Sequence, residues 1–210
     1  MAGRSPERPD VPRQYFDPAP ATTSRRRTVS LDLPGLHLDL LTDTGVFSGD
    51  RVDPGTKLLL LDGPSTAPGA TVLDLGCGYG PIAVTLARRG GPDVDVWAID
   101  VNERALDLCR DNAQAAGVDG QMHVLESSDL PDDVRFDQIW SNPPIRVGKP
   151  ALHALLLAGL DRLADDGTAH LVVQKHLGAD SLVSWLSGAG WPTRRTVSRA
   201  GYRLLEVGRR

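Results

Sequence analysis

The sequence predicts a doubly wound α/β domain built on a seven-stranded, mostly parallel sheet. From Thr71 onward, short apolar runs alternate with amphipathic segments, a pattern typical of repeated strand–helix–strand units. The last two predicted strands are separated only by Arg199-Ala200-Gly201. Because a parallel crossover needs about a dozen residues or more, this final pair is predicted to be antiparallel. A chain of 210 residues is long enough to bury one such core.

The elements of this domain are assigned from hydrophobic periodicity. Strands are predicted where short apolar runs are bounded by turn residues, and helices where apolar residues recur at three- and four-residue spacing. The predicted strands are Val72–Leu75, Val94–Ile99, Met122–Leu125, Phe136–Trp140, His170–Gln174, Arg194–Ser198 and Arg203–Val207. The predicted helices are Pro81–Arg89, Glu103–Ala116, a leucine stripe from Leu152 to Leu163 closed by Asp165-Asp166-Gly167, and Ala179–Gly188.

Two further segments precede this domain, which is assigned to residues 67–210. Residues 1–26 contain many prolines and few large apolar residues, which predicts a flexible arm. Within it, Arg25-Arg26-Arg27 overlaps the next segment and is either a solvated surface run or a phosphate contact. Residues 27–66 alternate on both sides of Pro34-Gly35, which predicts a hairpin, and continue into a loop and a short helix from about Pro54 to Leu61. We expect this extension to pack beside the domain as a lid or platform.

The composition argues against several classes of protein. No apolar run reaches the ~18 residues of a membrane span, and no export signal is recognisable. The two cysteines, Cys77 and Cys109, fit a reducing cytoplasm. The five histidines lack metal-ligand spacing, so no metal site is predicted. A net charge of −4 argues against indiscriminate nucleic-acid binding but permits local basic patches.

A glycine-rich turn after the first strand of the domain predicts a nucleotide-type cofactor. Gly76, Gly78 and Gly80 lie between an apolar strand and a helix, where a ligand can approach bare backbone. Asp100 follows the second strand, 20 residues beyond Gly80. A carboxylate there can accept hydrogen bonds from ribose hydroxyls, both of dinucleotides and of nucleoside-type methyl donors.

Asp74 favours the methyl donor over a dinucleotide. It stands directly before the glycines, where a carboxylate would repel a pyrophosphate but attract the amino group and sulfonium of S-adenosylmethionine. It acts either directly or by fixing the turn. Asp129, after the third strand, either accepts from the adenine amine or is an ordinary loop acid.

Asn142-Pro143-Pro144-Ile145 follows the fourth strand and predicts the place where the methyl group is accepted. An exocyclic amine conjugated to a ring is a poor nucleophile because its lone pair is delocalised. The Asn142 side-chain oxygen and the Pro143 carbonyl could accept its two N–H groups and direct the lone pair toward the methyl group. Pro-Pro holds this geometry with little backbone freedom, and Ile145 would press on the flat face of the substrate.

With these residues the sequence resembles the class I S-adenosylmethionine-dependent methyltransferases, which have a Rossmann-like fold. Gly45-Val46-Phe47-Ser48, Asp53-Pro54-Gly55-Thr56 and Gly201-Tyr202-Arg203-Leu204-Leu205 are similar to the small-subunit ribosomal RNA guanine-N2 methyltransferases. The resemblance implies donor contacts at Asp74, Gly76, Asp100 and Asp129, and amine positioning by Asn142 and Pro143. The full predicted donor site is Asp74, Gly76, Cys77, Gly78, Tyr79, Gly80, Asp100, Val101, Ser128, Asp129 and Asn142, and the predicted catalytic residues are Asn142, Pro143, Pro144 and Ile145.

The predicted substrate is a guanine in ribosomal RNA. The family often has an aromatic residue where this chain has Ile145, so Phe47 is the alternative stacking partner for the base. Arg146, Lys149 and Lys175 are predicted to contact RNA phosphates, as is the arginine-rich C-terminus in part. Adenine N6 or a protein glutamine amide are alternative acceptors within the class. An NAD-dependent oxidoreductase and a non-catalytic RNA-binding module are the alternatives outside it.

Overall fold

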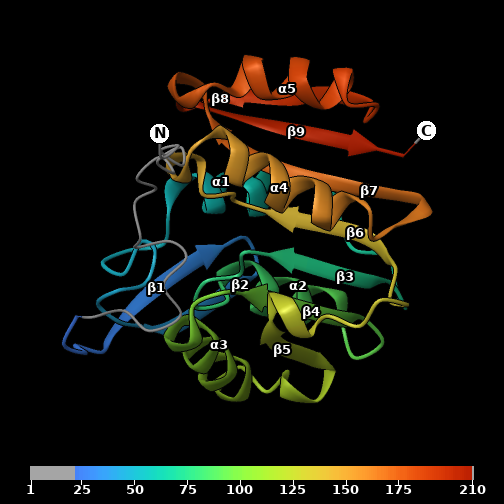
Figure 1. The fold of residues 1–210 in the computed structure, drawn as a ribbon. Coiled ribbons are helices and arrows are strands. Elements are labelled where there is room, and N and C mark those ends of the chain that lie inside the picture. The colour runs from blue at the N-terminus through green and yellow to red at the C-terminus, as the bar shows by residue number, and fades with distance from the viewer. Residues whose placement is uncertain (1–21, 210) are drawn as a thin grey trace, which may run out of the picture.

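The computed structural model describes residues 22–209, so residues 1–21 of the predicted arm lie outside it. Its main sheet has seven strands in the order β5-β4-β3-β6-β7-β9-β8 (Figure 1). The last strand, β9, pairs antiparallel with both β7 and β8, and the other pairs are parallel. The strands are β3 (Thr71–Leu75), β4 (Asp95–Asp100), β5 (Met122–Glu126), β6 (Phe136–Ser141), β7 (Leu163–Gln174), β8 (Thr193–Arg199) and β9 (Tyr202–Gly208). The predicted fold class is confirmed.

The five α-helices of residues 22–209 cover the two faces of this sheet. Helices α1 (Pro54–Asp62), α2 (Pro81–Gly90) and α3 (Glu103–Ala115) pack on one face, and α4 (Lys149–Leu160) and α5 (Ala179–Gly188) pack on the other (Figure 1). Consecutive residues of a strand point to opposite faces of the sheet. Val72 therefore packs in the hydrophobic cluster under α1, α2 and α3, and Leu73 in the cluster under α4 and α5. Because both faces are covered, the central strand β3 is buried on both sides, whereas the edge strand β8 is polar and largely exposed. None of the described helices is long and apolar enough to cross a membrane.

The predicted hairpin forms a separate two-stranded sheet from β1 (Arg27–Leu33) and β2 (Leu36–Thr42). Its inward side chains, among them Leu31 and Leu40, are buried in the same hydrophobic cluster as helices α1, α2 and α3. Asn112 of α3 fastens β2 to the domain. Its Oδ1 accepts from the N–H of Leu41 at 2.7 Å, and its Nδ2 group donates to the carbonyls of Leu41 and Tyr79 at 2.9 and 2.8 Å.

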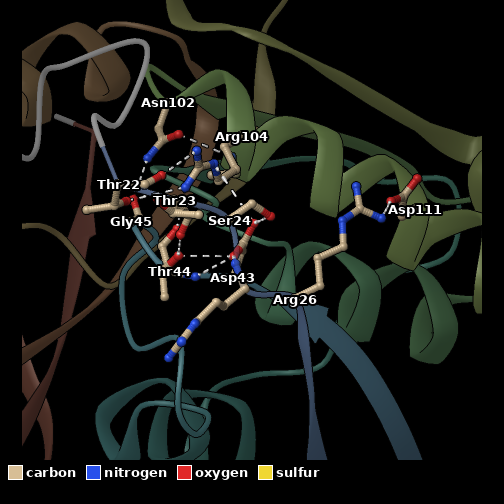
Figure 2. Close-up of polar contacts among 12 residues, drawn as sticks. Thr22, Thr23, Ser24, Arg26, Asp43, Thr44, Gly45, Asn102, Arg104 and Asp111 are labelled. Carbon is tan, nitrogen blue, oxygen red and sulfur yellow. Dashed lines mark hydrogen bonds and ion pairs between the residues drawn. The ribbon is translucent and has the colours of Figure 1, made fainter.

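A second polar anchor lies where β2 ends, and Figure 2 shows its contacts. Asp43 is buried and accepts hydrogen bonds from the Ser24 hydroxyl and from the backbone N–H groups of Arg25 and Thr44. Burial acts to raise the pKa of Asp43, but these hydrogen bonds outweigh it and lower the pKa below its ordinary value. Arg104 of α3 donates to the carbonyls of Thr22 and Thr44, at 3.0 and 2.8 Å. The segment leading into β1 is thereby tied to the N-terminal end of α3.

The structure departs from the sequence-based assignment at Leu163. The predicted helical stripe ran to this residue, but α4 ends at Leu160 and Leu163 begins β7, where it pairs with Phe136. Asp165-Asp166-Gly167 does not close the helix and lies inside an irregular stretch of β7, after which Thr168 pairs with Gln138. Leu163 is fully buried, and burial alone does not distinguish the end of a helix from the start of a buried strand.

Candidate active site

The glycine turn after β3 presents open backbone at the carboxyl end of the sheet. Gly76, Gly78 and Gly80 have φ values of +76°, +56° and +89°, a region that favours glycine. A Cβ at Gly76 or Gly78 would meet no atom within 4 Å, whereas one at Gly80 would lie 2.6 Å from Cys109 Sγ. The first two glycines therefore leave space for a ligand, and the third is required for packing against α3.

Asp74 lies behind this turn with no exposed surface. Its Oδ2 accepts a hydrogen bond from the Ala83 N–H in α2 at 3.0 Å, and its Oδ1 is buried without a partner among the described residues. Burial raises the pKa of Asp74 to about 8, and the neighbouring charge of Asp100 adds to the effect. A buried carboxyl oxygen without a donor is costly, and a cationic ligand in the turn would relieve this cost.

Asp100 is fixed against the same turn by three backbone groups. Its Oδ2 accepts from the Gly78 N–H at 2.8 Å, and its Oδ1 accepts from the N–H groups of Val101 and Asn102 at 2.8 and 3.0 Å. Burial raises its pKa, and these hydrogen bonds oppose the shift. A carboxylate has about four acceptor positions, so one remains for a ligand. Asn102 caps α3 and donates to the Gly45 carbonyl at 3.0 Å, which joins this turn to the loop that carries Phe47 (Figure 2).

The other predicted donor residues differ in burial and position. The side chains of Cys77 and Tyr79 are buried, so only their backbone is available to a ligand in the turn. Val101 is partly exposed beside Asp100. Ser128 and Asp129 are exposed after β5, and Asp129 lines a cavity of about 310 Å³ between α3 and β5. That cavity is lined by Glu103, Leu106, Asp107, Arg110, Leu125, Glu126 and Asp129, so no residue of the glycine turn contributes to it.

Asn142 lies beside the glycine turn because β3 and β6 are neighbours in the sheet. The Ser141 hydroxyl donates to the Leu75 carbonyl at 2.6 Å, which ties the ends of the two strands together. The Asn142 Nδ2 group donates to Asp53 Oδ1 at 2.8 Å and to Thr56 Oγ1 at 2.9 Å. Both acceptors belong to the start of α1. Both residues lie in a segment that resembles the family, but no role for them was predicted from the sequence. The Asp53-Pro54 pair signals a helix start, but nothing in it points to a residue 89 positions away.

The residues predicted to bind substrate differ in exposure. Pro143 is buried, and Pro144 and Ile145 are partly exposed. Arg146, Lys149 and Lys175 are exposed, and Phe47 exposes 46% of its surface. The five described C-terminal arginines all lie within ion-pair distance of an acid, so this surface is less positive than the sequence suggests. The pairs are Arg194 with Glu206, Arg195 and Arg203 with Asp180, Arg199 with Asp62, and Arg209 with Asp165.

No group of three or more potential metal-binding side chains comes together within residues 22–209. The candidate site consists of the buried acid Asp74, the open glycine turn, the backbone-bonded acid Asp100 and the oriented amide of Asn142. These groups suit a cationic nucleoside ligand on β3 and a planar amine in front of β6.

Comparison with known proteins connects this geometry to methyl transfer. Residues 37–205 match the family model of the methyltransferase small domain. The chain is 36% identical over 199 residues to the uncharacterized protein YbxB of Bacillus subtilis (strain 168), covering 92% of this chain and 96% of the relative. It is 33% identical over 152 residues to the ribosomal RNA small subunit methyltransferase C of Shewanella halifaxensis, covering 70% of this chain and 43% of the relative.

A solved structure is also similar. It is a T. thermophilus 16S rRNA guanine-N2 methyltransferase in complex with AdoMet and guanosine, with a TM-score of 0.75 and 28% sequence identity. The match covers 88% of this chain and 51% of that chain. The chain thus spans about half the length of the named ribosomal RNA methyltransferases that it matches.

Proposed function

Because the chain belongs to the methyltransferase small-domain family, and is thereby an S-adenosylmethionine-dependent methyltransferase, we propose that it methylates the exocyclic N2 amine of a guanine in ribosomal RNA. The observation that carries this proposal is the placement of the Asn142 amide next to the glycine turn, through the contact of Ser141 with Leu75. The similar ribosomal RNA methyltransferases support guanine as the acceptor. Action on ribosomal RNA would place the protein in the cytoplasm.

The residues around the glycine turn fit the methyl donor. Asp74 offers a buried acid toward the cationic amino group and sulfonium, Gly76 and Gly78 offer room against the backbone, and Asp100 offers an acceptor to the ribose. Asp129 is placed after β5, where it would accept from the adenine amine. S-adenosylmethionine supplies an electrophilic methyl group bound to a positively charged sulfur.

The acceptor amine would be held by Asn142 and Pro143. Asn142 Oδ1 and the Pro143 carbonyl would each accept one N–H of the amine, which keeps its lone pair directed at the methyl carbon. A carbon–nitrogen bond forms as the carbon–sulfur bond breaks, the electron pair of that bond stays on sulfur, and the nitrogen loses one proton to solvent. Such catalysis rests on positioning rather than on a general base with a shifted pKa.

The substrate would be bound by the rim of the site. Ile145 and Phe47 offer apolar contact to the base, and stacking on an aromatic side chain contributes about 1–3 kcal/mol per base. Arg146, Lys149 and Lys175 are exposed at the carboxyl ends of β6 and β7, where they would contact phosphates. Such contacts position the RNA without reading its sequence.

The test compares methyl transfer to three acceptors. Purified protein and labelled S-adenosylmethionine are incubated with ribosomal RNA from cells lacking the protein, with an adenine-only oligonucleotide and with a glutamine-bearing ribosomal protein. We expect the label in RNA, as N2-methylguanine by mass spectrometry. Asn142→Ala should abolish transfer while the Kd for S-adenosylmethionine remains measurable. Label in adenine or in protein instead would overturn the guanine assignment.

A further inference from the structure

The orientation of the Asn142 amide is set by the two groups that face its nitrogen. The carboxylate of Asp53 can only accept a hydrogen bond, so the amide must turn its NH₂ group toward Asp53. Thr56 Oγ1 takes the second N–H of the same group. Both hydrogens of Nδ2 are therefore engaged, and Oδ1 is turned to the other side. No described donor bonds Oδ1, which leaves its acceptor capacity for a substrate amine.

The element that supplies these two acceptors is held rigidly. Asp53 Oδ1 also caps α1, accepting from the backbone N–H groups of Gly55 and Thr56 at 2.8 and 3.1 Å. Three hydrogen bonds thus converge on one oxygen. Leu58, Leu59 and Leu60 of the same helix are buried in the core. A Cβ at Gly55 would lie 2.7 Å from Tyr202 Cε1, so the start of α1 packs closely on β9.

The charge of Asp53 also acts on two tyrosines. Burial raises the pKa of Tyr79, and the charge of Asp53 raises it further. The same two causes, in the same order, raise the pKa of Tyr202. The carboxylate that accepts from Asn142 is therefore near two buried or partly buried phenol groups, one from the segment after β3 and one from β9.

We infer that Asp53 and Thr56 are positioning residues for methyl transfer, which hold Asn142 with its Oδ1 facing the acceptor amine. This inference rests on the proposed function of Asn142. Free rotation of the amide would present NH₂ as often as oxygen, and a donor cannot accept the N–H of the substrate. The residues would therefore act through Asn142, without touching donor or substrate, and would affect turnover more than binding.

Thr56→Val is the decisive variant because it keeps the shape of the side chain and removes only the acceptor. We expect kcat with the undermethylated ribosomal RNA to fall by about ten- to a hundredfold, the range that follows from slight misplacement of a catalytic group. The KM for RNA and the Kd for S-adenosylmethionine should change by about threefold or less, because neither ligand would contact the Thr56 side chain. Thr56→Ser, which restores the hydroxyl, should recover kcat.

Thr42→Val is the matched control. Thr42 is a buried threonine of the same extension whose hydroxyl has no partner among the described residues, so kcat should remain at the wild-type value. Asp53→Ser keeps a residue type that caps helices well but is too short to reach Asn142, and it should lower kcat as Thr56→Val does. Thermal unfolding of each variant separates a loss of turnover from a loss of fold.

Exchange of the Asn142 side-chain amide protons tests the positioning role without any methyl transfer, so this test does not depend on which substrate is methylated. In ¹⁵N–¹H NMR spectra, the Asn142 side-chain amide is identified by its loss in Asn142→Ala. Its two protons should exchange slowly in the wild type, and faster in Thr56→Val but not in Thr42→Val. Wild-type kcat together with an unchanged amide signal in Thr56→Val would overturn the inference. If the wild type fails to methylate RNA, the proposed function fails, and the amide signals still decide the positioning.

Discussion

Replacing Asp74 by asparagine should change how the stability of this protein depends on pH. The Asp74 carboxyl is fully buried, with one oxygen bonded to the Ala83 N–H and the other without a partner among the described residues. Asparagine is nearly the same size, keeps an acceptor for Ala83 and carries no charge at any pH. The substitution therefore removes the titration of this position and leaves its packing almost unchanged.

The size of the effect follows from the pKa. Burial raises the pKa of Asp74 from 3.8 to about 8, so the folded state holds a proton that the unfolded chain releases at much lower pH. The stabilising effect of this proton is complete below the unfolded pKa and is lost as the pH rises toward 8. Between about pH 5 and 7 the loss is about 1.4 kcal/mol per pH unit, and at pH 7 it totals about 4 kcal/mol.

Urea unfolding followed by circular dichroism measures this effect directly. The free energy of unfolding of Asp74→Asn minus that of the wild type should grow by about 1.4 kcal/mol for each pH unit between about pH 5 and 7. Comparing the two proteins cancels the titrating groups that do not interact with Asp74. A difference that stays constant over this range would refute the reasoning, because it would mean that Asp74 is ionised throughout.

Three further predictions concern the donor. The affinity for S-adenosylmethionine, measured by calorimetry, should rise from about pH 6 to 8 in the wild type but not in Asp74→Asn, since a cation binds the ionised acid better; parallel profiles would contradict this. Asp100→Ala should weaken donor binding by about 1–3 kcal/mol, the cost of unpaired ribose hydroxyls, and an unchanged Kd would disprove the ribose assignment. Gly78→Ala and Gly91→Ala both place a Cβ in open space at positive φ, so each should lose about 1–2 kcal/mol of stability. Only Gly78→Ala should weaken donor binding, and an equal effect of Gly91→Ala on the Kd would argue against a donor in the turn.

Much of the fold could be predicted because its signals are local. The alternation around Pro34-Gly35 indicated the hairpin, and the short turn before Tyr202 indicated the antiparallel final pair. The error at Leu163 arose where local signals conflict, because a buried leucine at helical spacing fits the end of α4 as well as the start of β7. Only the pairing with Phe136 resolves the choice, and that pairing joins segments distant in sequence.

The candidate site was proposed from chemistry that lies within single motifs, and its residue roles stay predictions. The glycines, Asp100 and Asn142 each follow a strand, and the carboxyl ends of parallel strands share one edge of the sheet. The sequence did not reveal the raised pKa of Asp74 or the hydrogen bond from the Asn142 amide to Asp53. Both depend on which distant groups surround a side chain after folding, and neither burial nor a long-range hydrogen bond leaves a periodic pattern.

The core shared by the hairpin, α1 and the main sheet sets a limit on engineering. Gly63, just after α1, lies so close to Trp140 that a Cβ there would be 2.6 Å from the indole ring. A fragment trimmed to residues 67–210 would uncover that ring and leave the amide of Asn142 without its two anchors. We expect such a fragment to aggregate on expression. Grafting this catalytic unit onto a recognition module would thus require transplanting everything from about Thr22 onward, since Thr22, Ser24 and Arg25 bond Arg104 and Asp43.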